Sequence, residues 1–323
     1  MSWDEILGHE DAKRLLRWHV IAGRVANAYL IAGPDGIGKR RLALEMAKTI
    51  NCTRGPSERP CDACPTCSQI RRGVHPDVHV LLPGGPSDRI RIDDVRHVLG
   101  RAALRPFNAA MQVVILDGAE RITEEAANSV LKMLEEPPRH TRFFLTTARL
   151  AFCLPTIVSR CQVIRCGPLG LAALAEILVA NGTEASVAQA VAPLCGGSAS
   201  RALSLVERWS GYQQVMARVA GDSPEAWVEH PLPETREAVT ELIDGLIGWL
   251  RDLAVAAVDE TAPVNHVEYV AELRHQAATL DVDRCADLAC ELATLRESLE
   301  QFGNPRLIAT LVRERWLSLA SAR

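Results

Sequence analysis

The sequence predicts an α/β fold built on a parallel sheet, followed by a part that is helical throughout. Three observations lead to this prediction. Short apolar runs alternate with amphipathic segments up to residue 167, which is typical of strands buried between two layers of helices. A glycine-rich loop joins the first apolar run to the next helical segment. After Gly167 and Pro168 no run has the character of a strand, and residues 211–319 keep a helical pattern.

The predicted elements of the first part are justified by periodicity and by end signals. The first four predicted strands are short, mainly apolar runs, and each predicted helix repeats its apolar residues at helical spacing. Two end signals support the last helix, which has Thr123 as N-cap and ends before Pro137. The strands are predicted at residues 28–32, 78–82, 111–116, 143–146 and 162–165. The helices are predicted at residues 3–25, 41–50, 92–103 and 123–134.

Size and charge limit the possible classes of protein. With 323 residues, of which 48% are hydrophobic, the chain is expected to form two or three domains with cores of their own. The net charge of −4 argues against a polyanion-binding protein of the histone type. Residues 168–323 carry 12 Lys and Arg against 22 Asp and Glu, whereas the charges of residues 1–167 sum to +6. A basic first part and an acidic second part indicate different roles.

Targeting signals are not visible in the sequence. The N-terminus has neither the basic nor the apolar region of a secretory signal. The longest apolar candidate, from Leu246 to Val258, is interrupted by Arg251 and Asp252, and is too short to span a bilayer. We therefore expect a soluble, cytoplasmic protein.

The glycine loop from Gly33 to Arg40 fits the phosphate-binding pattern G-x-x-x-x-G-K between a strand and a helix. Backbone N–H groups at the start of such a helix cradle phosphates, and the lysine adds a point charge. The candidate phosphate-binding residues are Gly33, Gly36, Gly38 and Lys39. Arg40 stands where the pattern requires Ser or Thr to ligate Mg²⁺, so metal-assisted hydrolysis is in doubt. The alternative is an ordinary glycine-rich turn.

A second motif departs from the pattern of a hydrolysing enzyme. Asp117 follows the third apolar run, where P-loop enzymes hold magnesium. The next position, where a Glu would orient the attacking water, is Gly118, and Glu120 lies two residues further on. Losses at two separate positions, Arg40 and Gly118, favour a subunit that does not hydrolyse nucleotide.

Four cysteines within residues 51–75 predict a metal site. Four thiolates, the last three at C-x-x-C spacing, suit a tetrahedral zinc ion, and a site with four protein ligands is structural. An iron–sulfur cluster and chance clustering are the alternatives. The candidate ligands are Cys52, Cys61, Cys64 and Cys67. The other six cysteines are expected in the core: Cys153, Cys161, Cys166, Cys195, Cys285 and Cys290.

Taken together, these motifs resemble the AAA+ clamp-loader ATPases of bacterial replication over the whole chain. Further family motifs occur in the family's order, namely Leu131 to Pro138, Thr146-Thr147, Ser159-Arg160-Cys161, Gly196-Gly197-Ser198 and Asn304 to Leu307. The resemblance implies a RecA-like AAA+ domain at 1–167 with the zinc module at 51–75. It further implies a helical lid at 168–208 and a helical collar at 209–323 that holds a five-membered ring together.

The resemblance also implies roles and partners. Arg160 would be an arginine finger that reaches the ATP of a neighbouring subunit, Thr147 a sensor residue and Arg201 a lid sensor. Lys39 is retained, so ATP or ADP binding stays open. The implied partners are gamma/tau-type ATPase subunits, a delta subunit and the sliding clamp, and the chain would be a member of a hetero-pentamer. This assembled complex would contact primed DNA at the replisome on the nucleoid.

Three functions follow as hypotheses. The leading one is a non-hydrolysing clamp-loader subunit of the DNA polymerase III holoenzyme, a DNA-directed DNA polymerase. The second is an active ATPase of the gamma/tau type, which would have to work despite Arg40 and Gly118. The third is a stand-alone zinc-containing DNA-binding protein, although the sequence has no interleaved aromatic and basic residues for stacking bases.

Overall fold

The computed structural model describes residues 3–85, 88–221, 227–228, 231–278, 281–300 and 303–320. The chain divides into two compact units. The first consists of Met1–Ile177 together with Gly196–Arg201, and the second of Leu178–Cys195 together with Ala202–Arg323. The segment around Gly197 therefore belongs to the first unit, although it lies between two stretches of the second.

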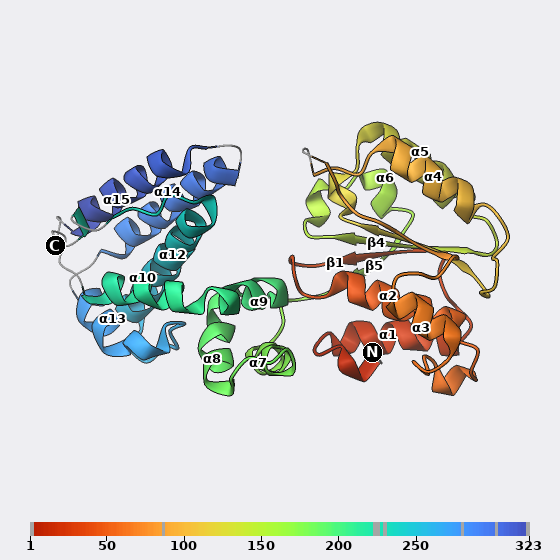
Figure 1. The fold of residues 1–323 in the computed structure, drawn as a ribbon, viewed down its shortest axis with the longest axis horizontal. Coiled ribbons are helices and arrows are strands. Elements are labelled where there is room, and N and C mark those ends of the chain that lie inside the picture. The colour runs from red at the N-terminus through yellow and green to blue at the C-terminus, as the bar shows by residue number, and fades with distance from the viewer. Residues whose placement is uncertain are drawn as a thin grey trace. The chain divides into compact units, whose positions relative to one another are not determined.

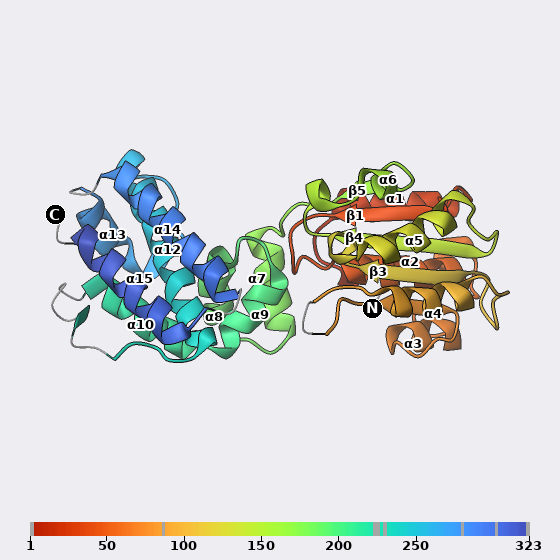
Figure 2. The ribbon, with the colours of Figure 1, turned by 90° about the horizontal axis from the view of Figure 1, so that it is seen from above.

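The first unit is built on a parallel five-stranded sheet with the strand order β2-β3-β4-β1-β5. Figure 2 shows β5, β1, β4 and β3 in this order. The pairing places Asp117 of β3 opposite Thr146 of β4, and Ala32 of β1 opposite Thr147. The strands are β1 (Ala28–Ala32), β2 (Val78–Leu81), β3 (Gln112–Asp117), β4 (Thr141–Thr147) and β5 (Gln162–Arg165).

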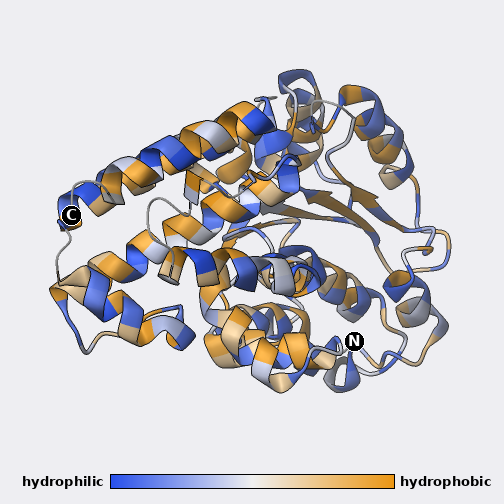
Figure 3. Ribbon diagram, turned by 60° about the vertical axis from the view of Figure 1, so that its left-hand side comes forward, coloured by the Kyte–Doolittle hydropathy of each residue, from blue (hydrophilic) through white to orange (hydrophobic). Residues whose placement is uncertain are grey.

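Helices cover both faces of this sheet (Figure 1). On one face lie α1 (Glu10–Ile21), α2 (Lys39–Asn51) and α3 (Pro65–Arg71). On the other lie α4 (Ile92–Ala102), α5 (Glu124–Glu135) and α6 (Pro155–Val158). The three inner strands β1, β3 and β4 are almost completely buried between these layers, and the strands are coloured mostly hydrophobic in Figure 3. This arrangement confirms the predicted α/β class of the AAA+ (RecA-like) type.

The sequence placed every strand of the sheet within two residues of its observed ends, but one helix prediction is wrong. Residues 3–25 do not form one helix: a short 3-10 turn at Trp3–Glu5 is followed by α1 from Glu10. Gly8 and His9 between them have left-handed backbone angles, with φ of 76° and 58°. A Cβ on Gly8 would lie 2.7 Å from Leu169 Cδ2, so a distant contact fixes this break.

From residue 168 onward the described residues form helices and no strand. The helices are α7 (Leu171–Ala180), α8 (Ala185–Val191), α9 (Ala199–Glu207), α10 (Trp209–Gly221), α12 (Arg236–Val258), α13 (Val270–Ala277), α14 (Val282–Glu300) and α15 (Pro305–Ala320). The long helix α12 contacts α10, α13, α14 and α15 and carries the fully buried Trp249. None of the helices among the described residues has the length and apolar character needed to cross a bilayer.

A polar network is buried inside the second unit. The carboxylate of Asp252, which has no exposed surface, accepts hydrogen bonds from Arg251 Nη1, from the backbone N–H groups of Asn265 and His266, and from His266 Nδ1. The other ring nitrogen of His266 lies 2.8 Å from the hydroxyl of Tyr212. Because all these groups are partnered, the network is compatible with an otherwise apolar core.

Candidate functional site

The glycine loop connects the end of β1 to the first turn of α2. Gly36 and Gly38 have φ angles of 75° and 98°, a left-handed backbone that favours glycine. A Cβ on Gly36 would lie 2.2 Å from Ser198 Oγ and 2.9 Å from Ser200 Cβ, whereas a Cβ on Gly38 would meet open space. The backbone N–H of Ser200 also donates to the carbonyl of Gly36. The segment 196–201 therefore packs directly on the loop.

The ammonium group of Lys39 is held by the loop itself. Lys39 is 7% exposed, and its Nζ donates to the carbonyl oxygens of Gly33 at 2.8 Å and Pro34 at 2.7 Å. A carboxylate oxygen of Asp35 lies 3.5 Å away. The loop thus combines a buried positive charge with the N-terminus of a 13-residue helix, an arrangement that favours an anionic group.

The side chain of Arg40 turns toward the third strand. Its Nη1 lies 3.2 Å from Oδ2 of Asp117. The other carboxylate oxygen of Asp117, Oδ1, accepts a hydrogen bond from the hydroxyl of Thr146 at 2.5 Å. Thr146 belongs to the Thr146-Thr147 motif of the sequence, but its contact with Asp117 was not predicted. Its signal is the strand register, because Asp117 and Thr146 are paired residues on neighbouring strands.

Gly118 and Glu120 are both held in contacts of their own. Gly118 has φ of 91°, and a Cβ there would lie 3.3 Å from the ring of Pro83, so a glutamate at this position would be strained. One carboxylate oxygen of Glu120 accepts from the backbone N–H of Ala148. Glu120 therefore supports the chain that follows β4, and it does not replace the glutamate missing at position 118.

Thr147 lies beside the loop, but its hydroxyl is already engaged. Thr147 is fully buried, and its Oγ1 accepts from the backbone N–H of Arg149 and from the thiol of Cys153. Its carbonyl oxygen accepts from the N–H of Gly33. Thr147 thus positions the glycine loop through its main chain. Arg201 is exposed, and its backbone N–H donates to Ser198 Oγ at 3.4 Å.

Arg160 lies at the surface, away from the glycine loop in sequence and held by its own local contacts. Its Nη2 is 2.6 Å from Oε1 of Glu135, at the end of α5. Its Nη1 donates to the carbonyl of Thr156 and to Ser159 Oγ. About a third of the Arg160 side chain is exposed.

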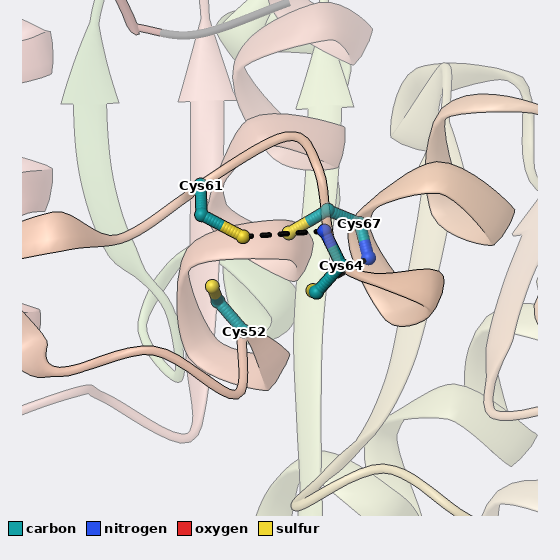
Figure 4. A group of neighbouring side chains, drawn as sticks. All are labelled: Cys52, Cys61, Cys64 and Cys67. Atoms are coloured by element: carbon teal, nitrogen blue, oxygen red, sulfur yellow. Dashed lines mark hydrogen bonds between the residues drawn. The ribbon is translucent and has the colours of Figure 1, made fainter.

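The four predicted cysteine ligands come together. Their sulfur atoms all lie within 4.8 Å of one another, and three of the residues are buried. Figure 4 shows the sulfurs converging on a common point, with the N–H of Cys64 donating to the sulfur of Cys61. Zinc–sulfur bonds of about 2.3 Å in a tetrahedron place sulfurs about 3.8 Å apart, so the donor set fits a zinc ion.

The surroundings of the sulfurs stabilise the thiolate of Cys64 but the protonated thiol of Cys67. Burial raises the pKa of Cys64, but hydrogen bonds from the backbone of Cys67 and Thr53 outweigh it and bring the pKa to about 6. Burial and the neighbouring thiol of Cys64 raise the pKa of Cys67. A cation among the sulfurs would counter this cost, because thiolates are the metal-binding form.

Helix α2 connects the loop and the cysteine cluster. It begins at Lys39 and ends at Asn51, immediately before Cys52. In its last turns the buried ammonium of Lys48 contacts Glu45 Oε2 at 2.7 Å and Oδ1 of Asp62, which lies between Cys61 and Cys64. One oxygen of Glu45 has no hydrogen-bond partner, and burial raises the pKa of Glu45 to about 7.

The prediction for the remaining cysteines is wrong at one position. Cys153, Cys166, Cys195 and Cys285 are buried and Cys161 is partly buried, as expected of small apolar residues. Cys290 is exposed, because α14 turns this position outward while Leu288 and Leu292 of the same helix are buried.

The comparisons with known proteins agree with this architecture. The model of the family described as "DNA polymerase III, delta subunit" matches residues 8–169, half of the chain. The delta' subunit of DNA polymerase III from Pseudomonas aeruginosa is 34% identical over 231 residues, which cover 67% of this chain and 70% of that protein. The delta' subunit from Bacillus subtilis is 33% identical and covers 59% and 58%. The tau subunit from Escherichia coli is 26% identical and covers 87% and 41%.

Proposed function

Because the chain belongs to the delta' family of DNA polymerase III clamp-loader subunits, we propose that it is a non-hydrolysing member of a clamp-loader ring. It completes the ring beside gamma/tau-type ATPase subunits and a delta subunit, and helps to load the sliding clamp on primed DNA. The division into an AAA+ domain (1–167), a lid (168–208) and a collar (209–323) belongs to the same proposal.

The contact between Arg40 and Asp117 is the observation that carries the non-hydrolysing role. In P-loop enzymes a hydroxyl and an aspartate at these two positions hold Mg²⁺. Here an arginine replaces the hydroxyl and occupies one oxygen of the aspartate. The left-handed backbone at Gly118 adds independent support, since the position is unsuited to a catalytic glutamate.

In this proposal Arg160 acts in trans on the ATP of a neighbouring subunit. A guanidinium placed against the transferring phosphate stabilises the charge of the transition state. Its contact with Glu135 keeps the side chain oriented in the single chain, where both groups are partly exposed. Glu135 is thus a positioning residue that releases Arg160 when a neighbour supplies the stronger phosphate contact.

The four cysteines hold a structural zinc ion in this proposal. The ion would fix the short module of residues 51–75, which has few apolar residues of its own apart from the cysteines and Ile70. With four protein ligands it leaves no open position for catalysis.

The test is the DNA-stimulated ATPase of the reconstituted clamp loader with Arg160→Ala in this chain. We expect ATP turnover at the neighbouring site that Arg160 reaches to fall at least about tenfold, because arginine fingers supplied in trans contribute roughly 10³–10⁵ in rate. Arg72→Ala, which removes another exposed arginine of the same unit, is the matched control. Gel filtration verifies assembly, and unchanged turnover in an intact complex refutes the finger role.

The retained Lys39 favours one second candidate, an active ATPase of the gamma/tau type. Its buried ammonium at the glycine loop is the feature that such an enzyme requires. Turnover of ATP by the purified chain with Mg²⁺, abolished by Lys39→Ala, would establish this candidate in place of the first.

A further inference from the structure

The glycine loop and the strand end beside it do not fit a magnesium ion. Mg²⁺ requires octahedral oxygen ligands at about 2.0–2.1 Å, and in P-loop proteins the chain supplies a hydroxyl and a carboxylate. The hydroxyl is absent here, because its position is Arg40. Both oxygens of the carboxylate are engaged, Oδ2 by the guanidinium of Arg40 and Oδ1 by Thr146.

Charge adds to this disagreement. A divalent cation beside Asp117 would lie next to the permanent positive charge of Arg40, which cannot be deprotonated in a protein. To admit the ion, the guanidinium would have to leave the carboxylate and the ion would have to lose part of its water. Mg²⁺ gives up its water reluctantly, and only one carboxylate would replace it.

The features that receive phosphate are nevertheless present. The loop keeps its left-handed glycines, the start of α2 presents its N-terminal N–H groups, and Lys39 is held against the loop. The Arg40 guanidinium contacts Asp117 through Nη1, and half of the Arg40 side chain is exposed to solvent. Phosphates at this loop would thus meet two side-chain cations without any metal ion.

We propose that this loop binds a nucleoside polyphosphate without magnesium, with the guanidinium of Arg40 in the place of the metal ion beside Asp117. This inference deepens the proposed non-hydrolysing role and rests on it. The chain would hold its nucleotide as a fixed structural ligand, since the metal that assists hydrolysis in P-loop enzymes has no place to bind.

The experiment measures the affinity of the full-length chain for a fluorescent N-methylanthraniloyl-ADP by anisotropy, with and without added MgCl₂. Magnesium is omitted by pretreating the buffers with chelating resin, so that no chelator strips metal from the four cysteines. We expect the two dissociation constants to agree within about twofold, a difference below about 0.5 kcal/mol. Lys39→Ala should abolish binding under both conditions.

Arg40→Ser tests the role of the guanidinium directly. Serine restores the hydroxyl and frees Asp117, so we expect binding that is at least about tenfold tighter with Mg²⁺ than without it. Arg41→Ser removes the same charge from the neighbouring position and should keep the metal independence. Circular dichroism verifies that each variant is folded.

Two results would overturn the inference. One is binding by the unchanged chain that requires Mg²⁺, and the other is no binding of the probe at any concentration under either condition. Neither result bears on Arg160, whose effect on the assembled complex is measured separately. The proposed role in the ring can therefore fail or stand independently of the nucleotide site.

Discussion

The packing of segment 196–201 on the glycine loop makes a sharp prediction about two neighbouring glycines. Gly36 and Gly38 both have left-handed backbone angles, so alanine at either position costs about 1–2 kcal/mol in backbone strain. The two positions differ in their surroundings. A Cβ at 36 would lie 2.2 Å from Ser198 Oγ, whereas a Cβ at 38 would meet nothing within 4 Å.

Gly36→Ala should therefore carry an overpacking cost that Gly38→Ala does not. Inserting a methyl group into packed surroundings costs about 1–3 kcal/mol. We expect Gly36→Ala to destabilise the first unit by about 2–5 kcal/mol and Gly38→Ala by about 1–2 kcal/mol. The double variant Gly36→Ala/Ser198→Ala lacks the nearest atom, Ser198 Oγ. It should recover part of the stability that Gly36→Ala loses relative to Gly38→Ala.

Hydrogen exchange of peptides from β1 and β4, followed by mass spectrometry without nucleotide, reports the opening free energy of the first unit. Peptides from α12 report the second unit and should not change, which controls for global effects. Equal destabilisation by the two alanine variants, or a larger effect of Gly38→Ala, would show that segment 196–201 does not pack on the loop.

Three further predictions concern the cysteine cluster and two buried carboxyl groups. Cys64→Ser should remove bound zinc, measured by atomic absorption, and should lower the melting temperature. Replacing the exposed Cys290 by serine should change neither the zinc content nor the melting temperature. Absence of zinc from the unchanged chain would refute the site. Since the pKa of Glu45 is raised from 4.5 to about 7, the folded state retains a proton that the unfolded state loses. Its contribution to stability is complete below pH 4.5 and falls as the pH rises to about 7. Glu45→Gln should reduce this fall in the free energy of unfolding, measured by urea unfolding at a series of pH values. An unchanged dependence of that free energy on pH would contradict the role of Glu45. Asp252→Ala leaves several buried donors without an acceptor and should cost about 3–5 kcal/mol in urea unfolding followed by tryptophan fluorescence. The exposed Asp287→Ala should have little effect, and similar losses in the two variants would refute the importance of the network.

The strands and the cysteine cluster were predictable because their signals are local. Strands β1, β3 and β4 are mainly apolar runs that the sheet buries almost completely, and the four thiols lie within sixteen residues of one another. The break at Gly8 was not predictable, because Leu169, the residue that crowds it, is distant in sequence. Local periodicity has no information about such a contact.

The site depended on strand register, which the sequence does not specify. Thr146 and Thr147 are adjacent residues of the same type, and successive side chains of a strand point to opposite faces. Only the pairing of β3 with β4 decides that Thr146 contacts Asp117. The contact of Arg160 with Glu135 likewise depends on tertiary structure, because it joins the turn after α6 to the last residue of α5.

The course of α2 has a mechanical consequence. Thirteen residues at 1.5 Å each make α2 about 20 Å long, with the glycine loop at its N-terminus and Cys52 directly after its C-terminus. The far tip is pinned twice, by the chain entering the cluster and by the contact of Lys48 with Asp62. A metal ion bound to the cysteines would fix the C-terminal end of α2, and would thereby set the direction in which its N-terminus points at the glycine loop. Loss of the ion would then change the direction of the N-terminus of α2 at the loop, although none of the four cysteines lies in the loop.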